Sequence, residues 1–118
     1  MTKHVETYKE FTFEAAHETP PFSKLHGHSF RVGIHLTGEP DPVYGWPANL
    51  YEVDRKIASL RETLDDSYLN DIKGLEVPSL ENVAAWIWES LQPEFPGLDR
   101  IEVSRGSVGH AEGCVYRG

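Results

Sequence analysis

The chain has 118 residues, the usual length of a single domain, so residues 1–118 are expected to form one folded unit. Hydrophobic residues make up 39% of the sequence and charged residues 25%, a composition that is typical of globular proteins and argues against disorder. Nineteen acidic and eleven basic side chains give a net charge of −8, which would repel a phosphate backbone and excludes nucleic acid as a general partner.

The N-terminal segment and the single cysteine indicate the compartment. Residues 1–10 are rich in charge and lack the apolar stretch of a signal peptide. No apolar run approaches the ~20 residues that span a bilayer, and Cys114, as the only cysteine, excludes an internal disulfide. We therefore expect a soluble, cytoplasmic protein without a membrane partner.

Alternating apolar residues predict two strands in the first third of the chain. One covers residues 6–16 and the other residues 26–36. The apolar face of the first carries Phe11, Phe13 and Ala15, and that of the second carries Phe30, Val32, Ile34 and Leu36. The opposite faces are polar, as in two antiparallel strands with one face in water.

Two helices follow, each with a capping residue. Asn49 is expected to cap the first, with Glu52 completing a pattern like a capping box, and Ser79 to cap the second. Apolar residues recur at helical spacing from Leu50 to Leu64 and from Leu80 to Leu91. Residues 38–47 and 68–78 are expected to be connections.

Residues 101–107 and 113–117 are predicted as closing strands, separated by a glycine-rich segment. The order is then strand, strand, helix, helix, strand, strand. This order predicts an α+β fold in which two helices pack on one face of an antiparallel four-stranded sheet.

Three of the six histidines extend the predicted apolar faces. His17 continues the face of the first strand, and His26 and His28 continue that of the second. Adjacent antiparallel strands would bring these ends together, and three neutral imidazoles are a ligand set of catalytic zinc sites. The alternative is half-buried or interface histidines with ordinary hydrogen-bond partners. His4 and His35 are expected to be solvated.

Several segments resemble the 6-pyruvoyltetrahydropterin synthase and 6-carboxytetrahydropterin synthase family, and most closely its bacterial queuosine-pathway branch. They are Phe13–His17, Leu25–Phe30, Thr37–Glu39, Leu64–Asp65, Tyr68–Asp71, Pro78–Asn82 and Gly113–Gly118. The resemblance implies a tunnelling fold (T-fold), assembly into homotrimers or homohexamers with sites between subunits, and 7,8-dihydroneopterin triphosphate as substrate. It also implies a Zn²⁺ cofactor held by His17, His26 and His28.

The sequence departs from the family pattern at three catalytic positions. The family's cysteine base is absent from residues 18–24, and Asp66 and Ser67 stand where a histidine would follow Asp65. Arg105 aligns with the glutamate that anchors the pterin. A positive charge there would oppose a group that needs a carboxylate partner.

Other side chains are candidates for the missing roles. Asp65 is a candidate for an orienting or base role, His110 for a general acid or base near neutral pH, and Arg105 for binding a substrate carboxylate or phosphate. The alternatives are a solvated helix end for Asp65, a bystander in a loop for His110, and an exposed strand end for Arg105.

The leading functional hypothesis is a zinc-dependent lyase that works by elimination or retro-aldol cleavage on a pterin triphosphate or related small molecule. One alternative is a diverged paralogue whose substrate is an anionic carbonyl compound. The other is a non-catalytic zinc- or ligand-binding oligomer.

Overall fold

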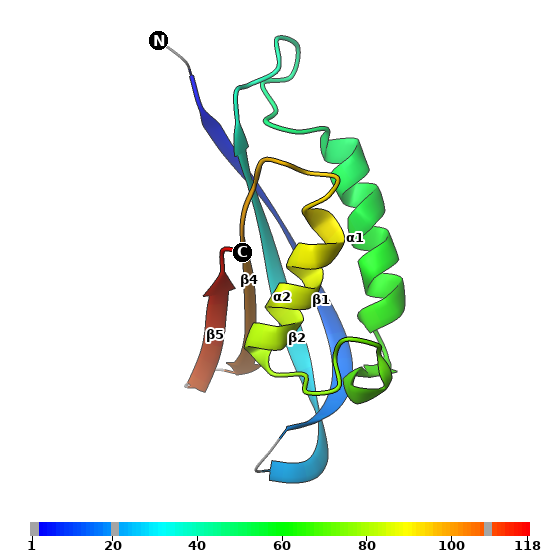
Figure 1. The fold of residues 1–118 in the computed structure, drawn as a ribbon. Helices are drawn as coiled ribbons and strands as arrows, with labels where there is room; N and C mark the ends of the chain where they lie inside the picture. The colour runs from blue at the N-terminus through cyan, green and yellow to red at the C-terminus, as the bar shows by residue number, and fades with distance from the viewer. Residues whose placement is uncertain (1–2, 20–21, 108–109) are drawn as a thin grey trace.

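Two long antiparallel strands form the centre of the fold (Figure 1). β1 covers Val5–Thr19 and β2 covers Phe22–Gly38, and their register runs from the pair Val5–Gly38 to the pair His17–His26, with Thr19 opposite Phe22 beyond an irregularity. The structure is a computed structural model that describes residues 3–19, 22–107 and 110–118, and the side chains of residues 22–26, 107 and 110 are outside this description.

Three further strands complete one mixed sheet. β3 covers Ser67–Tyr68, β4 Leu98–Ser107 and β5 His110–Tyr116, and the strand order is β3-β1-β2-β4-β5. β3 is the strand that the sequence analysis missed, so the prediction of four strands is corrected to five within the described residues. The Asp66 amide donates to the Glu14 carbonyl at 2.7 Å, which draws the chain parallel to β1 for two residues.

The two predicted helices are confirmed with their caps. α1 covers Leu50–Leu64, and the Asn49 side chain accepts from two amides of its first turn. α2 covers Leu80–Leu91, and the Ser79 side chain accepts from the Asn82 amide. A short 3-10 helix, η1, occupies Leu69–Asp71 within the predicted connection. Among the described residues, no helix is long and apolar enough to cross a membrane.

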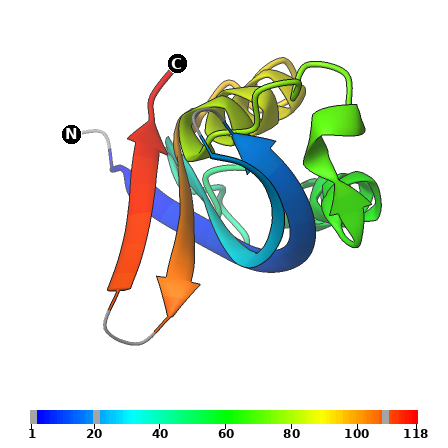
Figure 2. The same cartoon turned by 90° about the horizontal axis from the view of Figure 1, so that it is seen from below.

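Both helices lie on one side of the curled sheet, as the view from below shows (Figure 2). The core lies between the helices and this face, and the alternation of apolar residues in β1 and β2 explains why. Its largest fully buried side chains include Phe13, Phe30, Ile34, Leu36, Leu64, Ile87, Leu91 and Ile101. The predicted α+β arrangement of helices on one sheet face is therefore confirmed.

Candidate functional site

The helix-covered face of β1 and β2 ends in histidines, as the sequence predicted. The register pairs Ala15 with His28 and His17 with His26, so all three histidine positions belong to the face that carries the core. The His17 side chain is fully buried. The His28 ring lies 5.1 Å from it between centroids and nearly perpendicular, with an interplanar angle of 84°.

A backbone carbonyl orients the His17 ring. Nδ1 lies 3.1 Å from the Pro78 carbonyl oxygen, which only accepts, so Nδ1 carries the proton and donates. Nε2 is then the acceptor nitrogen, and Arg105 Nη1 lies 2.8 Å from it. Histidines that bind metals usually have this second hydrogen bond, because it fixes the tautomer and the ring orientation. The donor chemistry of His17 therefore fits a zinc ligand.

The segments next to His17 are held by residues whose role the sequence analysis missed. The Asn70 side chain accepts from the Glu18 amide and donates to the Glu18 carbonyl, both at 2.9 Å. The Asn82 side chain donates to the Val77 carbonyl at 2.8 Å and so fixes the loop that supplies Pro78. Both asparagines lie in segments that carry the family resemblance. An asparagine side chain can donate and accept at once, and this property could have indicated from the sequence that these residues hold backbone groups.

Arg105 lies beside His17. It pairs with Phe30 across the sheet, which places it on the core-facing side at the end of β4. Its Nη1 is 2.8 Å from His17 Nε2, and its Nε and Nη2 are 2.7 and 2.6 Å from the Glu112 carboxylate. The positive charge expected at this position is thus paired with a carboxylate. Sequence reasoning missed Glu112, because its place opposite Arg105 depends on the β4–β5 register.

Asp65 lies at the end of α1 and fastens it to β1. Its Oδ1 accepts from the Glu14 amide at 2.8 Å, and its Oδ2 is 3.5 Å from Arg61. The neighbouring Asp66 has a φ of 56°, a left-handed conformation that aspartate tolerates better than most residues. Asp66, not Asp65, lines a cavity of about 480 Å³ together with His28 and Ser67. The catalytic role of Asp65 stays a prediction.

Two candidates lie partly outside the description. The structure gives only the backbone of His26, opposite His17, and of His110, at the start of β5. Among the side chains that are described, no group of three histidines, cysteines or carboxylates gathers closely enough to hold a metal. His17 and His28 are the two described members of the predicted trio.

The prediction that His35 is solvated is wrong. It lies on the sheet face away from the helices, yet its residue exposure is only 8%. The Tyr8 ring stacks on it at 5.4 Å, and the carboxylates of Glu6 and Glu102 lie 3.2 and 3.3 Å from its two ring nitrogens. His4 is exposed as predicted. At Cys114, burial raises the thiol pKa, with Glu81 adding to the effect, so this group stays protonated.

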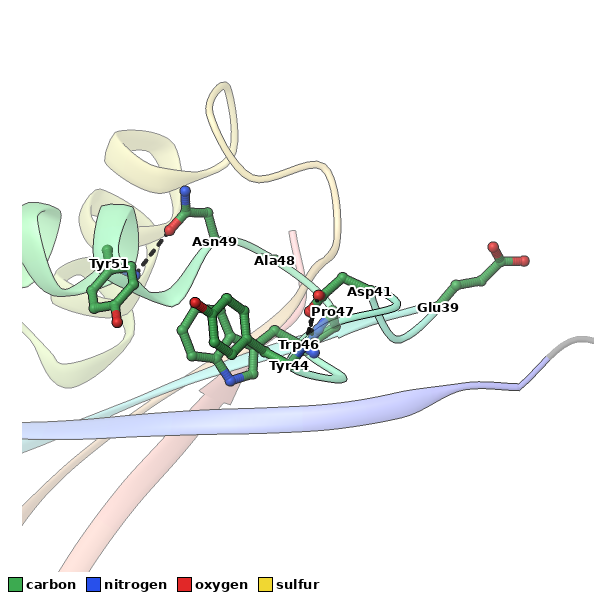
Figure 3. A pocket seen from close by; sticks show the side chains of 8 residues that line it. All are labelled: Glu39, Asp41, Tyr44, Trp46, Pro47, Ala48, Asn49 and Tyr51. Carbon is green, nitrogen blue, oxygen red and sulfur yellow. Dashed lines mark hydrogen bonds between the residues drawn. The ribbon is translucent and has the colours of Figure 1, made fainter.

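A second cavity, of about 410 Å³, lies at the other end of the molecule between β2 and α1. Tyr44 stacks on Trp46 at 4.4 Å, and Tyr51 stands edge-on to Trp46 at 5.4 Å (Figure 3). Asp41 turns back onto its own loop, and its carboxylate accepts from the amides of Val43, Tyr44 and Trp46. The described residues that line this second cavity include no histidine. The candidate site is therefore the end of the sheet that carries His17 and His28.

We expect the Asp41 loop to contribute to acid sensitivity. The amide of Tyr44, with those of Trp46 and Val43, lowers the Asp41 pKa below its ordinary value of 3.8. A carboxyl whose pKa is lower when folded contributes stability above its unfolded pKa and loses it as pH falls through the folded pKa. Melting temperatures from pH 5 to pH 2 should therefore fall less steeply in Asp41→Asn than in the wild type. Parallel curves would contradict this assignment.

Comparison with known proteins places the chain in a family. The family model described as 6-pyruvoyl tetrahydropterin synthase matches residues 6–117. The chain belongs to this family. Among curated relatives of this 6-pyruvoyl tetrahydropterin synthase family member, the 6-carboxy-5,6,7,8-tetrahydropterin synthase of Synechocystis is 37% identical over 107 residues, 81% of this chain and 82% of the relative. The dihydroneopterin monophosphate aldolase of Pyrococcus furiosus is 29% identical over 101 residues, 81% of this chain and 85% of the relative.

The fold agrees with that of solved members of the family. The 6-pyruvoyl tetrahydropterin synthase of Caenorhabditis elegans superposes with a TM-score of 0.84 at 22% identity, covering 99% of this chain and 97% of the other. The predicted T-fold is therefore confirmed, with the two-residue β3 as the addition to the expected sheet.

Proposed function

We propose that this protein is a zinc-dependent lyase that acts on the side chain of a dihydropterin, with 7,8-dihydroneopterin triphosphate or a related compound as substrate. The observation that supports it most is the His17 geometry, in which one ring nitrogen is fixed by the Pro78 carbonyl and the ring lies 5.1 Å from that of His28 between centroids. Family membership and the 37% identity to a 6-carboxytetrahydropterin synthase point to the same chemistry.

His17, His26 and His28 would hold the zinc ion. His17 and His28 approach from neighbouring strands, and His26 has the register position opposite His17. The chemistry supplied by zinc at such a site is Lewis acidity, which polarises a carbonyl or lowers the pKa of a hydroxyl oxygen. The burial of His17 keeps water from its ring and holds the ligand rigidly.

The remaining candidates divide the tasks of binding and proton transfer. Asp65 would orient the strand that carries His17, because its Oδ1 holds the Glu14 amide three residues before that histidine. His110 would accept or return the side-chain proton at an imidazole nitrogen, in place of the absent cysteine. Arg105 would bind an anionic group of the substrate through its guanidinium.

We also propose that the enzyme is a cytoplasmic homotrimer or homohexamer. β3 and β5 are the two edges of the sheet, and an exposed edge offers unpaired backbone groups to another copy of the chain. A neighbouring subunit that pairs with β5 would then lie beside Arg105 and Glu112 and contribute residues to the candidate site.

The test is turnover by zinc-loaded protein, with triphosphate release and pterin products measured with and without a chelator. 7,8-dihydroneopterin triphosphate and dihydroneopterin monophosphate are offered separately, because the first tests elimination and the second retro-aldol cleavage. We expect chelator-sensitive product from at least one of them. No product from protein that holds zinc in full would overturn the proposed lyase.

A further inference from the structure

Arg105 holds the nitrogen that a metal would need. The proton on Nδ1 of His17 leaves a single acceptor lone pair, on Nε2, and Arg105 Nη1 lies 2.8 Å from it. A guanidinium has only donors, so this contact is a hydrogen bond from Arg105 to His17. A metal ion would use the same lone pair, and the two cations exclude one another there.

Glu112 holds the guanidinium independently of His17. Nε and Nη2 of Arg105 form a two-pronged contact with Glu112 Oε1 at 2.7 and 2.6 Å, while Nη1 is the group that faces His17. The guanidinium is planar and rigid, so Nη1 can leave His17 only if the whole group moves. The side chains of Arg105 and Glu112 are 22% and 48% exposed, so the pair lies at a solvent edge toward which both can move. Arg105 can therefore give up His17 and keep its carboxylate partner if the Glu112 side chain moves with it.

We propose that Arg105 is a built-in competitor for the metal at His17, so that loading the site requires Nη1 to leave Nε2 as the Arg105–Glu112 pair moves away from His17. This inference rests on the metal centre of the proposed function. It adds a determinant of metal affinity that is not itself a ligand, and it explains how a fully buried histidine keeps both ring nitrogens satisfied before metal enters.

The test compares zinc affinity in Arg105→Met and the wild type, measured by competition with a chromophoric chelator. Methionine keeps an unbranched apolar side chain about as long as the aliphatic part of arginine and removes the competing donors. Because a hydrogen bond from a charged group contributes about 1.5–3 kcal/mol, the affinity should rise roughly 10-fold to 100-fold in the variant. Arg55→Met removes the same charge from the exposed face of α1, where Arg55 pairs with Glu52, and should leave the affinity unchanged.

The outcomes separate the two proposals. Equal or weaker zinc binding by Arg105→Met would overturn the competition and leave the metal centre standing. No zinc binding by either protein would overturn the metal centre and the competition together. A second measurement is the imidazole ¹⁵N spectrum of zinc-free wild-type protein, in which His17 should be the neutral Nδ1–H tautomer. The opposite tautomer would also overturn the competition, because its Nε2 could not accept from Arg105.

Discussion

Zinc binding should be lost in His28→Ala. His28 is the described ring nearest to His17, and removal of a direct ligand should lower zinc affinity by at least about 100-fold, beyond the 10-fold to 100-fold typical of outer-shell changes. His28 is the better choice for the test because it is only partly buried. At His17, alanine would also remove the partner atoms of the Pro78 carbonyl and of Arg105 Nη1. Metal content after dialysis and chelator competition measure the effect.

The melting temperature provides a second test of the His28→Ala substitution. A ligand that binds only the folded state adds about 2.7 kcal/mol at 100 times its Kd, so zinc should raise the melting temperature of the wild type. His28→Ala should gain nothing from zinc. His4→Ala, which removes an exposed histidine near the N-terminus, should behave as the wild type does. Full zinc content in His28→Ala would remove His28 from the ligand set.

The sequence was sufficient for the elements whose patterns are local. Alternation identified the core-facing residues of β1 and β2, and the capping residues Asn49 and Ser79 identified where both helices begin. The same alternation placed His17 and His28 on the apolar face, which needed no knowledge of the tertiary structure. β3 was missed because two residues carry no periodicity, and a backbone hydrogen bond from Asp66 to Glu14 defines it.

Contacts that depend on register could not be predicted in the same way. Arg105 faces Glu112 because β5 begins at His110, three residues earlier than the glycine-rich pattern indicated. A one-residue change of register would move Glu112 to the other face of the sheet. His35 was misjudged for a related reason: its strand face is polar, but Tyr8 and two carboxylates from neighbouring strands cover it. Polar neighbours therefore do not imply contact with water.

Asp65→Asn should keep most of the activity, whereas Asp65→Ala should lose it. Oδ1 accepts from the Glu14 amide, and asparagine can offer the same oxygen, but alanine cannot. We expect Asp65→Ala to destabilise the fold by about 1–2 kcal/mol, because the hydrogen bond to the charged group is lost at a partly exposed position. The displaced end of β1 should lower kcat/KM by about 100-fold, a typical cost of misplacing a site by 1 Å.

The conservative variant separates an orienting role from a base. In Asp65→Asn, kcat/KM should stay within about tenfold of the wild type with an unchanged pH profile, since a positioning oxygen need not titrate. A loss of 100-fold or more without a loss of stability would make Asp65 the base instead. Asp66→Asn is the matched comparison, because Asp66 lines the cavity together with His28 and asparagine also tolerates the φ of 56°. If activity falls only in Asp66→Asn, the proton acceptor lies one residue after Asp65, where the family pattern has a histidine.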